Sequence, residues 1–367
     1  MRISFQNFIL STLIKLTFKS KKNFSYKKII IHRVGSIGDT VVSLPAIFSL
    51  KEKFPESKIF ILFCNDHLSF NSIKKLTSNY IDGYYEYSLK SKKINNFINI
   101  LKEIRKQKFD LWLSLPQDLS NFRQEFRNIL FASISSSKSI FGFRVNIDKK
   151  TIRDSKLDLH ENEKIRLLNI VQELSSSKLL NKLPSKQYID ISKINFSKDY
   201  FKSKNIFNNK LLVICIGSNR LPNKWNYVNY QFIIKKWILN EGSVVLLGGK
   251  NELDYSKKIS EGIDSTLFNN FVGLCDIYDS TLFLSKAYLV LGNDTGMMHI
   301  ADLIYLNIVS IFSSRDFKGK WYPTNSSSDV FRPNIECSCF LKNECFERCI
   351  NLNKKEDVWE FIKKKYL

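Results

Sequence analysis

The chain has 367 residues, of which 44% are hydrophobic and 25% are charged, and its formal net charge at pH 7 is +22. This composition is typical of a globular protein and excludes an intrinsically disordered one, and the length suits two domains better than one core. No run of about 18 apolar residues occurs, so we expect no membrane-spanning helix.

The positive charge comes mainly from lysines that are spread along the whole chain. Such a charge favours anionic partners, which include nucleic acid, acidic glycolipids and anionic membrane surfaces. A compositional drift toward Lys, Asn, Ile and Phe explains the excess equally well. The charge alone therefore does not select the partner.

Residues 1–27 form a basic N-terminal segment that we treat separately. Phe5, Phe8 and Leu16 recur at near-helical spacing, and Lys15 interrupts the apolar stretch. A signal peptide is disfavoured, because the apolar stretch is split and no small-residue cleavage site follows. The segment is an amphipathic helix that lies on a membrane surface, or a helix packed on the body of the protein. On either interpretation we expect a cytoplasmic protein, peripheral on the inner face of the inner membrane.

The remaining chain alternates apolar runs with helical periodicity. We expect strands at 29–32, 58–63, 110–115, 139–143, 211–216, 243–247, 269–272, 288–291 and 308–312. We expect helices at 40–54, 94–106, 122–132, 161–174, 227–240, 252–261, 280–286, 295–303 and 356–365. Repeated βα units predict parallel sheets covered by helices on both faces, with ligands beyond the carboxyl ends of the strands.

We expect an α/β protein with two Rossmann-like domains. The N-terminal domain is placed at residues 28–185 and the C-terminal domain at 206–349. The polar stretch 175–206 is interpreted as the connection between them. Residues 350–367 are expected to form a C-terminal helix that packs back on the body.

The turn after the first strand reads RVGSIGD. It lacks the G-x-G pair of dinucleotide-binding turns. Asp39 either caps the following helix or, on the floor of a cleft, accepts a proton from a substrate hydroxyl. Gly35 and Gly38 would let a bulky acceptor approach the backbone, and Ser36 would bind that acceptor or the carboxylate. His32 is the rival base, for which a packing role is favoured.

A second turn, NDTGMMH, lies between the last-but-one strand and its helix. Asp294 and Thr295 stand where a helix is capped, and Gly296 leaves room for a phosphate at the helix N-terminus. His299 lies four residues after Thr295 and can face the same ligand.

A third loop follows the strand at 211–216. Gly217, Ser218 and Asn219 leave the strand end, and Lys224 comes just beyond them. A lysine in this loop would neutralise a diphosphate without a metal ion.

Four of the seven cysteines lie within thirteen residues of one another: Cys337, Cys339, Cys345 and Cys349. They could hold zinc, form disulfide bridges or remain reduced. The spacing lacks the paired C-x2-C knuckles of common zinc sites, so in a cytosolic protein it favours a local structural clip or reduced thiols over a metal or redox site.

Taken together, these motifs resemble glycosyltransferase family 9, which includes the lipopolysaccharide heptosyltransferases and has the GT-B fold. The matching features are Arg33-x-Gly35-Ser36-Ile37-Gly38-Asp39 with Leu44-Pro45, Phe54-Pro55, Phe141-Gly142-Phe143, His160, Lys224-Trp225, Gly248-Gly249 and Asn293-Asp294-Thr295-Gly296-x-x-His299-x-Ala301, followed by the cysteine-bearing tail. The similarity runs from about residue 28 to the C-terminus. Asn226 and Met297 depart from the usual pattern.

The resemblance implies two domains that face each other across a cleft. It implies an inverting transfer, without metal or cofactor, from a nucleotide-diphosphate sugar, usually ADP-heptose, to an acidic glycolipid. In this mechanism Asp39 is the general base, and Lys224 and the helix at Thr295-Gly296 stabilise the departing diphosphate. Asp294 and His299 would position the donor. The acceptor would contact Arg33, Ser36, Gly38, Arg123, Arg127 and Arg144, although each arginine is as readily a solvated surface residue.

Three other functions are weighed against this one. The donor sugar could be a hexose or hexosamine, because the sequence does not fix it. A non-catalytic scaffold that binds sugar nucleotides is disfavoured, since Asp39 and the Asp294 turn are both present. A nucleic-acid-binding protein is disfavoured because no helix-turn-helix, RNA-binding or zinc-finger pattern accompanies the charge.

Overall fold

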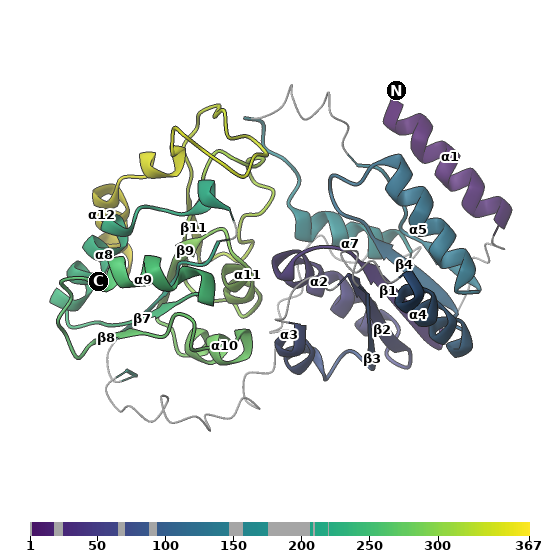
Figure 1. The fold of residues 1–367 in the computed structure, drawn as a ribbon, viewed down its shortest axis with the longest axis horizontal. Coiled ribbons are helices and arrows are strands. Elements are labelled where there is room, and N and C mark those ends of the chain that lie inside the picture. Colours follow the sequence, from purple (N-terminus) through teal and green to yellow (C-terminus); the bar gives the residue numbers. More distant parts are fainter. Residues whose placement is uncertain are drawn as a thin grey trace. The chain divides into compact units, whose positions relative to one another are not determined.

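The computed structural model describes residues 2–17, 25–64, 70–87, 94–146, 157–174, 206–207, 210–218 and 220–367. The expected connection at 175–206 therefore lies almost entirely outside the described residues. The chain divides into two compact units, one comprising Met1–Ser155 with Glu163–Lys186 and the other Lys156–Asn162 with Gln187–Leu367 (Figure 1).

The boundary differs from the expected one at a short segment. Residues 156–162, expected in the first domain, belong to the second unit. The backbone N–H of His160 donates to the Lys318 carbonyl (2.8 Å), and the Asn162 amide donates to the Gly319 carbonyl (3.1 Å). These contacts with the C-terminal half explain the assignment.

The first unit contains a parallel sheet. Its described strands are Lys28–Arg33 (β1), Lys58–Cys64 (β2), Gly83–Tyr87 (β3), Leu111–Leu115 (β4) and Ser139–Phe141 (β5). Among the described residues their order is β3-β2-β1-β4-β5. The direction of strand addition reverses between β1 and β4, which makes their carboxyl ends the topological switch point where such folds bind ligands.

Helices cover both faces of this sheet (Figure 1). The described helices are Arg2–Thr17 (α1), Ile37–Lys53 (α2), Phe70–Thr77 (α3), Ile94–Gln107 (α4), Phe122–Ile134 (α5) and Glu163–Glu173 (α7). One core cluster joins Leu10 of α1, Ile104 of α4 and Ala132 of α5 to Ile30 and Trp112 of the sheet. The α2 and α7 helices pack against each other.

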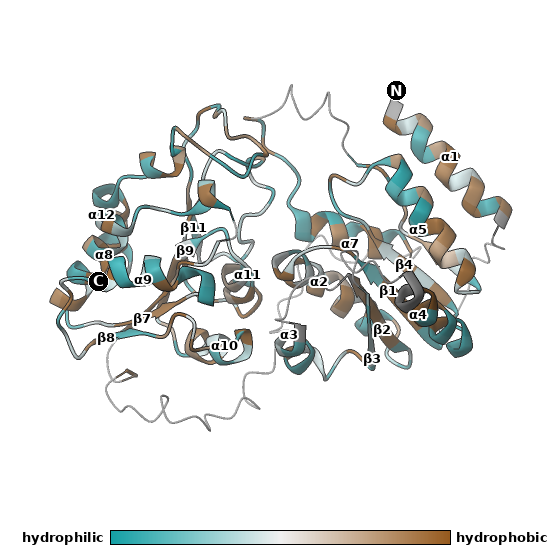
Figure 2. Ribbon diagram, in the orientation of Figure 1, coloured by the Kyte–Doolittle hydropathy of each residue, from teal (hydrophilic) through white to brown (hydrophobic). Residues whose placement is uncertain are grey.

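The N-terminal helix α1 packs on the first unit through one side only. Leu10 is fully buried, and the Asn7 side chain donates to the Val145 carbonyl (2.9 Å) and accepts from its N–H (2.8 Å). Phe5 and Phe8 remain 63% and 66% exposed, and Figure 2 shows hydrophobic residues recurring along α1 between hydrophilic ones. None of the described helices is long and apolar enough to cross a membrane.

The second unit contains another parallel sheet. Its described strands are Leu211–Cys215 (β6), Ser243–Leu247 (β7), Phe268–Asn270 (β8), Leu289–Asn293 (β9), Ile308–Ile311 (β10) and Ser328–Phe331 (β11). Their order among the described residues is β11-β10-β9-β6-β7-β8. This is the Rossmann strand order, with the switch point between β6 and β9.

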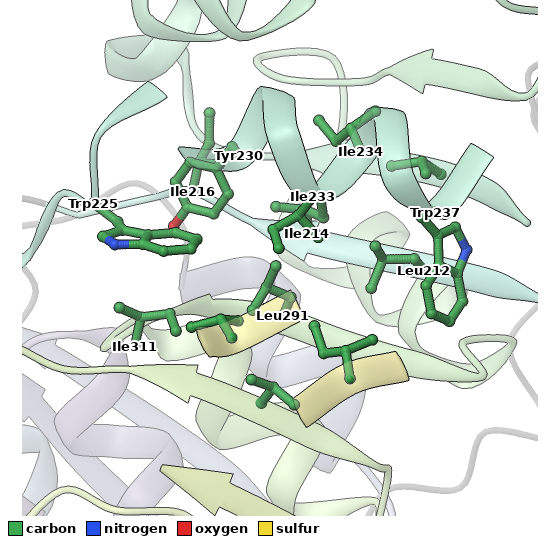
Figure 3. Close-up of a cluster of buried hydrophobic side chains, with 14 of the residues drawn as sticks. Leu212, Ile214, Ile216, Trp225, Tyr230, Ile233, Ile234, Trp237, Leu291 and Ile311 are labelled. Atoms are coloured by element: carbon green, nitrogen blue, oxygen red, sulfur yellow. The ribbon is translucent and has the colours of Figure 1, made fainter. Parts of the chain in front are cut away.

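The second unit contains α-helices and short 3₁₀ helices, which are labelled η. They are Leu221–Asn223 (η3), Tyr227–Leu239 (α8), Lys250–Glu252 (η4), Leu253–Ser260 (α9), Ile277–Ser285 (α10), Gly296–Leu303 (α11), Cys349–Leu352 (η5) and Lys355–Tyr366 (α12). Figure 3 shows Tyr230, Ile233 and Trp237 of α8 packed over Ile214 and Leu291 of the sheet. Residues of α12 join this cluster, so the C-terminal helix packs on the second unit.

All nine predicted strands and all nine predicted helices are confirmed within a few residues at their ends. The α3 helix and the β3 and β11 strands were not predicted. Both strands lie at a sheet edge, and most of their residues are only partly buried, so their sequences lack a clear apolar run.

Candidate functional site

The turn after β1 is built around a close contact between Gly35 and Asp39. Gly35 has φ +151°, and a Cβ atom there would lie 2.4 Å from the Asp39 Cβ, so only glycine fits. Ser36 caps α2: its hydroxyl accepts from the Asp39 N–H (3.4 Å), and the Asp39 carboxylate accepts from the Ser36 N–H (2.7 Å) and hydroxyl (2.7 Å). The capping interpretation of Asp39 is confirmed, and the carboxylate remains 22% exposed.

Arg33 is buried beside this turn, whereas contact with the acceptor was expected. Its side chain is fully buried and donates to the carbonyls of Leu115 (3.1 Å) and Pro116 (3.0 Å). Its Nη2 lies 3.4 Å from Glu163 and 3.6 Å from Asp39. Burial lowers the pKa of the Arg33 guanidinium, and the two carboxylates oppose this change. The buried Arg33 guanidinium therefore lies against Asp39, and its contact with an acceptor stays a prediction.

His32 packs inside the first unit, as expected. Its Nε2 lies 2.9 Å from the Tyr87 hydroxyl, and its ring is 2% exposed. Burial lowers the His32 pKa to about 3, with a smaller contribution from Arg127. The ring is therefore neutral at physiological pH.

A cavity of about 120 Å³ opens at the switch point of the first sheet. Its lining residues lie at the ends of β1 and β4, in the segments that follow them, or on α5. They are His32, Val34, Ser114, Leu115, Pro116, Gln117, Ser120, Gln124, Glu125, Arg127 and Asn128. Among the described residues, the Arg127 Nε, one Glu125 oxygen and the Asn128 amide oxygen are buried without a hydrogen-bond partner. Buried polar groups are normally paired, so these atoms indicate a polar ligand or ordered water.

Of the four arginines expected to contact the acceptor, only Arg127 lines this cavity. Arg123 is exposed on the same helix. Arg144 makes a bidentate ion pair with Glu173, with N–O distances of 3.1 and 2.8 Å. Glu125 and Asn128 were not singled out from the sequence, because nothing local marks which face of α5 lines a cavity.

In the second unit, the turn after β9 carries Asp294, Thr295 and Gly296, where the sequence predicts a phosphate-binding site. Thr295 caps α11 by accepting from the Met297 N–H (3.1 Å). His299 Nε2 lies 3.6 Å from an Asp294 oxygen, while its buried Nδ1 has no hydrogen-bond partner among the described residues. The other Asp294 oxygen accepts from the Asn223 amide (3.3 Å). Asp294 is half-buried, so its carboxylate is held in place yet reachable.

Lys224 follows η3 and pairs with Glu252, which was not predicted from the sequence. Its Nζ lies 3.2 Å from Glu252 and 5.9 Å from the centre of the Tyr255 ring. The other Glu252 oxygen accepts from the Gly249 N–H (3.0 Å) after β7. Glu252 stands three residues after Gly249, so the spacing of a helix cap could have found it.

The remaining predicted donor residues lie in the loop after β6. A Cβ atom at Gly217 would meet open space, which leaves room beside the backbone. The Ser218 hydroxyl accepts from the Arg220 N–H (3.1 Å) and donates to its carbonyl (3.0 Å). Asn219 lies outside the described residues. The described donor candidates thus come from segments that follow the carboxyl ends of β6 and β9, the two strands of the switch point.

Solved structures match this architecture along almost the whole chain. A glycosyl transferase family 9 protein from Veillonella parvula matches with a TM-score of 0.72 and 15% identity, covering 93% of this chain and 98% of that one. The E. coli ADP-heptose lps heptosyltransferase II matches with a TM-score of 0.63 and 15% identity, covering 92% and 98%. The fold is therefore that of the GT-B glycosyltransferases, as the sequence predicted.

The family follows from the sequence comparison. Residues 98–351 match the family description "Glycosyltransferase family 9 (heptosyltransferase)". A lipopolysaccharide heptosyltransferase 1 from Campylobacter coli is 24% identical over 364 residues, covering 92% of this chain and 98% of that protein. The chain belongs to glycosyltransferase family 9 and is a glycosyltransferase.

Proposed function

We propose that this enzyme transfers a heptose from ADP-heptose to a hydroxyl of a lipopolysaccharide core or another lipid-linked acceptor, with inversion and without a catalytic metal ion. The observation that carries the proposal is the set of groups around the switch point of the second unit. There Lys224 and the N-terminus of α11 offer positive charge and N–H donors, and Asp294 offers a carboxylate for sugar hydroxyls.

These groups suit a leaving nucleoside diphosphate. The N-terminus of α11 favours an anion through its free N–H groups and helix dipole. Lys224 supplies a point charge that the Glu252 contact keeps in one position. The choice of donor is supported by the similar E. coli protein, which is an ADP-heptose lps heptosyltransferase II.

The first unit suits a hydroxyl acceptor. Asp39 is the proposed general base, since its carboxylate is fixed by Ser36 and Arg33 and is partly exposed. In the cavity at the switch point of the first sheet, the Nε of Arg127 has no hydrogen-bond partner among the described residues. It could bind a phosphate or carboxylate of the acceptor. A lipopolysaccharide acceptor is supported by the Campylobacter coli relative, which is a lipopolysaccharide heptosyltransferase 1.

We also propose that the enzyme lies on the inner face of the inner membrane. The outward side of α1 presents Phe5, Phe8 and Leu16, of which Leu16 is 80% exposed. Aromatic and basic residues on one helix suit an anionic interface, which is also where a glycolipid acceptor resides.

The donor is tested by thermal shift of the purified enzyme with ADP, UDP, GDP or CDP, with and without EDTA. Selective stabilisation by ADP that survives EDTA and is lost in Asp294→Ala supports the proposal. Asp254→Ala, which changes a carboxylate that is 94% exposed in the same unit, is the matched control. Preference for another nucleotide would favour a hexose or hexosamine donor, and no response to any would favour a non-catalytic scaffold.

A further inference from the structure

Cys337, Cys339, Cys345 and Cys349 meet in one buried cluster in the second unit. Each is at most 5% exposed, and their four sulfur atoms all lie within 4.8 Å of one another. The Cys337 and Cys345 sulfurs are 3.6 Å apart, and those of Cys339 and Cys349 are 3.7 Å apart.

The separations of 3.6 and 3.7 Å match two edges of a metal-centred tetrahedron, and the other separations are at most 4.8 Å. A disulfide needs an S–S distance of about 2.05 Å. Four thiolates around one zinc ion, with Zn–S bonds of about 2.3 Å, lie about 3.8 Å apart along each edge. The cluster therefore has the size of a single four-coordinate ion, and it leaves no room for the inorganic sulfides of an iron–sulfur cluster.

The backbone around this cluster has no regular secondary structure. Between the end of β11 and Cys349 the structure assigns no helix or strand to residues 332–348. Leu341 and Arg348 have φ of +57° and +46°, a region that is unfavourable for a non-glycine residue unless its surroundings hold it there. Four ligands to one ion would supply such a constraint.

Groups around the sulfurs suit thiolates. The Ser314 N–H points to the Cys349 sulfur (3.4 Å), and the Cys339 N–H points to the Cys337 sulfur (3.5 Å). The buried Arg315 guanidinium donates to the Lys342 carbonyl beside the cluster. Glu347 lies 3.3 Å from the Cys337 sulfur, but it is an exposed residue and can turn to solvent when that thiol loses its proton.

We propose that the four cysteines bind one structural Zn²⁺ ion. Tetrahedral sulfur ligation selects zinc or iron, and a given site binds Zn²⁺ more tightly than Fe²⁺. All four positions are taken by the protein, so the site is closed and holds no water for catalysis. A closed site of this kind would take no direct part in the sugar transfer.

The zinc would fix the loop that carries Lys224. Cys349 begins η5, where the Asn351 side chain accepts from the Asn226 N–H (3.0 Å). The Asn353 carbonyl then accepts from the Trp225 indole (3.0 Å). This consequence rests on the proposed function, whereas the metal site itself does not.

The first experiment is metal analysis of the enzyme purified without a metal-affinity step or added metal. We expect one equivalent of zinc per chain, released when a mercurial reagent blocks the thiols. Replacement by Co²⁺ should give the intense sulfur-to-cobalt absorption of a tetrahedral thiolate site. These measurements need no variant and no sugar donor.

Variants then locate the ion. Cys339→Ser and Cys349→Ser should each lose most of the zinc and lower the melting temperature, whereas Cys275→Ser, outside the cluster, should retain both. Iron in place of zinc, two disulfides shown by mass and thiol counting, or four reduced thiols without metal would each overturn the proposal. A zinc-loaded enzyme without response to nucleotides would contradict the proposed function and leave the metal site standing.

Discussion

In the proposed mechanism, the Asp39 carboxylate both caps α2 and acts as the general base. One oxygen accepts from the Ser36 N–H and hydroxyl, and the other lies 3.6 Å from Arg33. If Asp39 is the general base, Asp39→Asn should lower kcat by about 10²–10⁴-fold, because a neutral amide cannot take a proton. Donor binding should be unchanged, since the proposed donor residues belong to the other unit. Kinetics with ADP-heptose and nucleotide thermal shifts measure the two effects.

A second helix cap provides the control for Asp39. Asp276 caps α10 by accepting from the Asp279 N–H (2.8 Å). Asp276→Asn makes the same chemical change at a cap outside the site and should leave kcat within a few-fold of the parent. Near-parental turnover in Asp39→Asn would restrict Asp39 to capping.

Glu125 should make stability depend on pH. Burial raises its pKa from 4.5 to about 7, and hydrogen bonds from Ser120 and Asn128 only partly oppose this. The folded state therefore binds more protons than the unfolded state between pH 4.5 and 7, so stability falls as pH rises through that window. Glu125→Gln should raise the melting temperature at pH 8 and have little effect at pH 4.5.

The size of the Glu125 effect is bounded by the shift in its pKa. That shift corresponds to a loss of about 1–3 kcal/mol in the free energy of unfolding at pH 8. Melting curves at several pH values measure it, and Glu103→Gln, an exposed carboxylate in the same unit, is the control. Equal melting temperatures for parent and Glu125→Gln at pH 8 would show that Glu125 is not buried in its charged form.

At the scale of elements, local patterns predicted most of the fold and only part of the site. The turn at Ser36 and Asp39 could be predicted because its two partners are three residues apart. The Glu163 contact that holds Arg33 spans 130 residues and has no local signal. Arg127 was predicted to contact the acceptor but not to line a cavity, because that position depends on how α5 packs over β1 and β4.

The α1 helix makes the membrane proposal testable. Phe5 and Phe8 are largely exposed, and Leu10 on the opposite side anchors the helix. Replacing both phenylalanines by serine should abolish most binding to vesicles that contain anionic lipid, because the apolar contact with the interface is lost. Melting temperature should change little, since neither ring is buried. Vesicle co-sedimentation at two salt concentrations measures the effect.

The control for the Phe5 and Phe8 substitution in α1 is a substitution in the other unit. Leu239 at the end of α8 is 76% exposed, and Leu239→Ser should leave vesicle binding intact. Unchanged binding by the Phe5 and Phe8 variant would assign the attraction to the overall charge of +22 alone. In that case, binding should disappear at high salt in both proteins.

At the scale of the whole molecule, the sheets give each unit its own switch point and, in the proposed mechanism, its own substrate. Lys224→Gln should then lower kcat/KM for the donor, and Arg127→Gln should raise the KM for the acceptor. Each loses a charge-assisted contact worth about 1.5–3 kcal/mol, which corresponds to about 10- to 100-fold.

The double variant tests whether the two substrates are handled separately. Substitutions at sites that share no partner are additive in free energy, so the changes in kcat/KM should multiply. Lys250→Gln, an exposed lysine near Glu252, controls for the loss of one positive charge. If Arg127→Gln instead weakens ADP binding, the arginine serves the donor. The cavity at the first switch point would then not be the acceptor site, and the acceptor would have to bind elsewhere near Asp39.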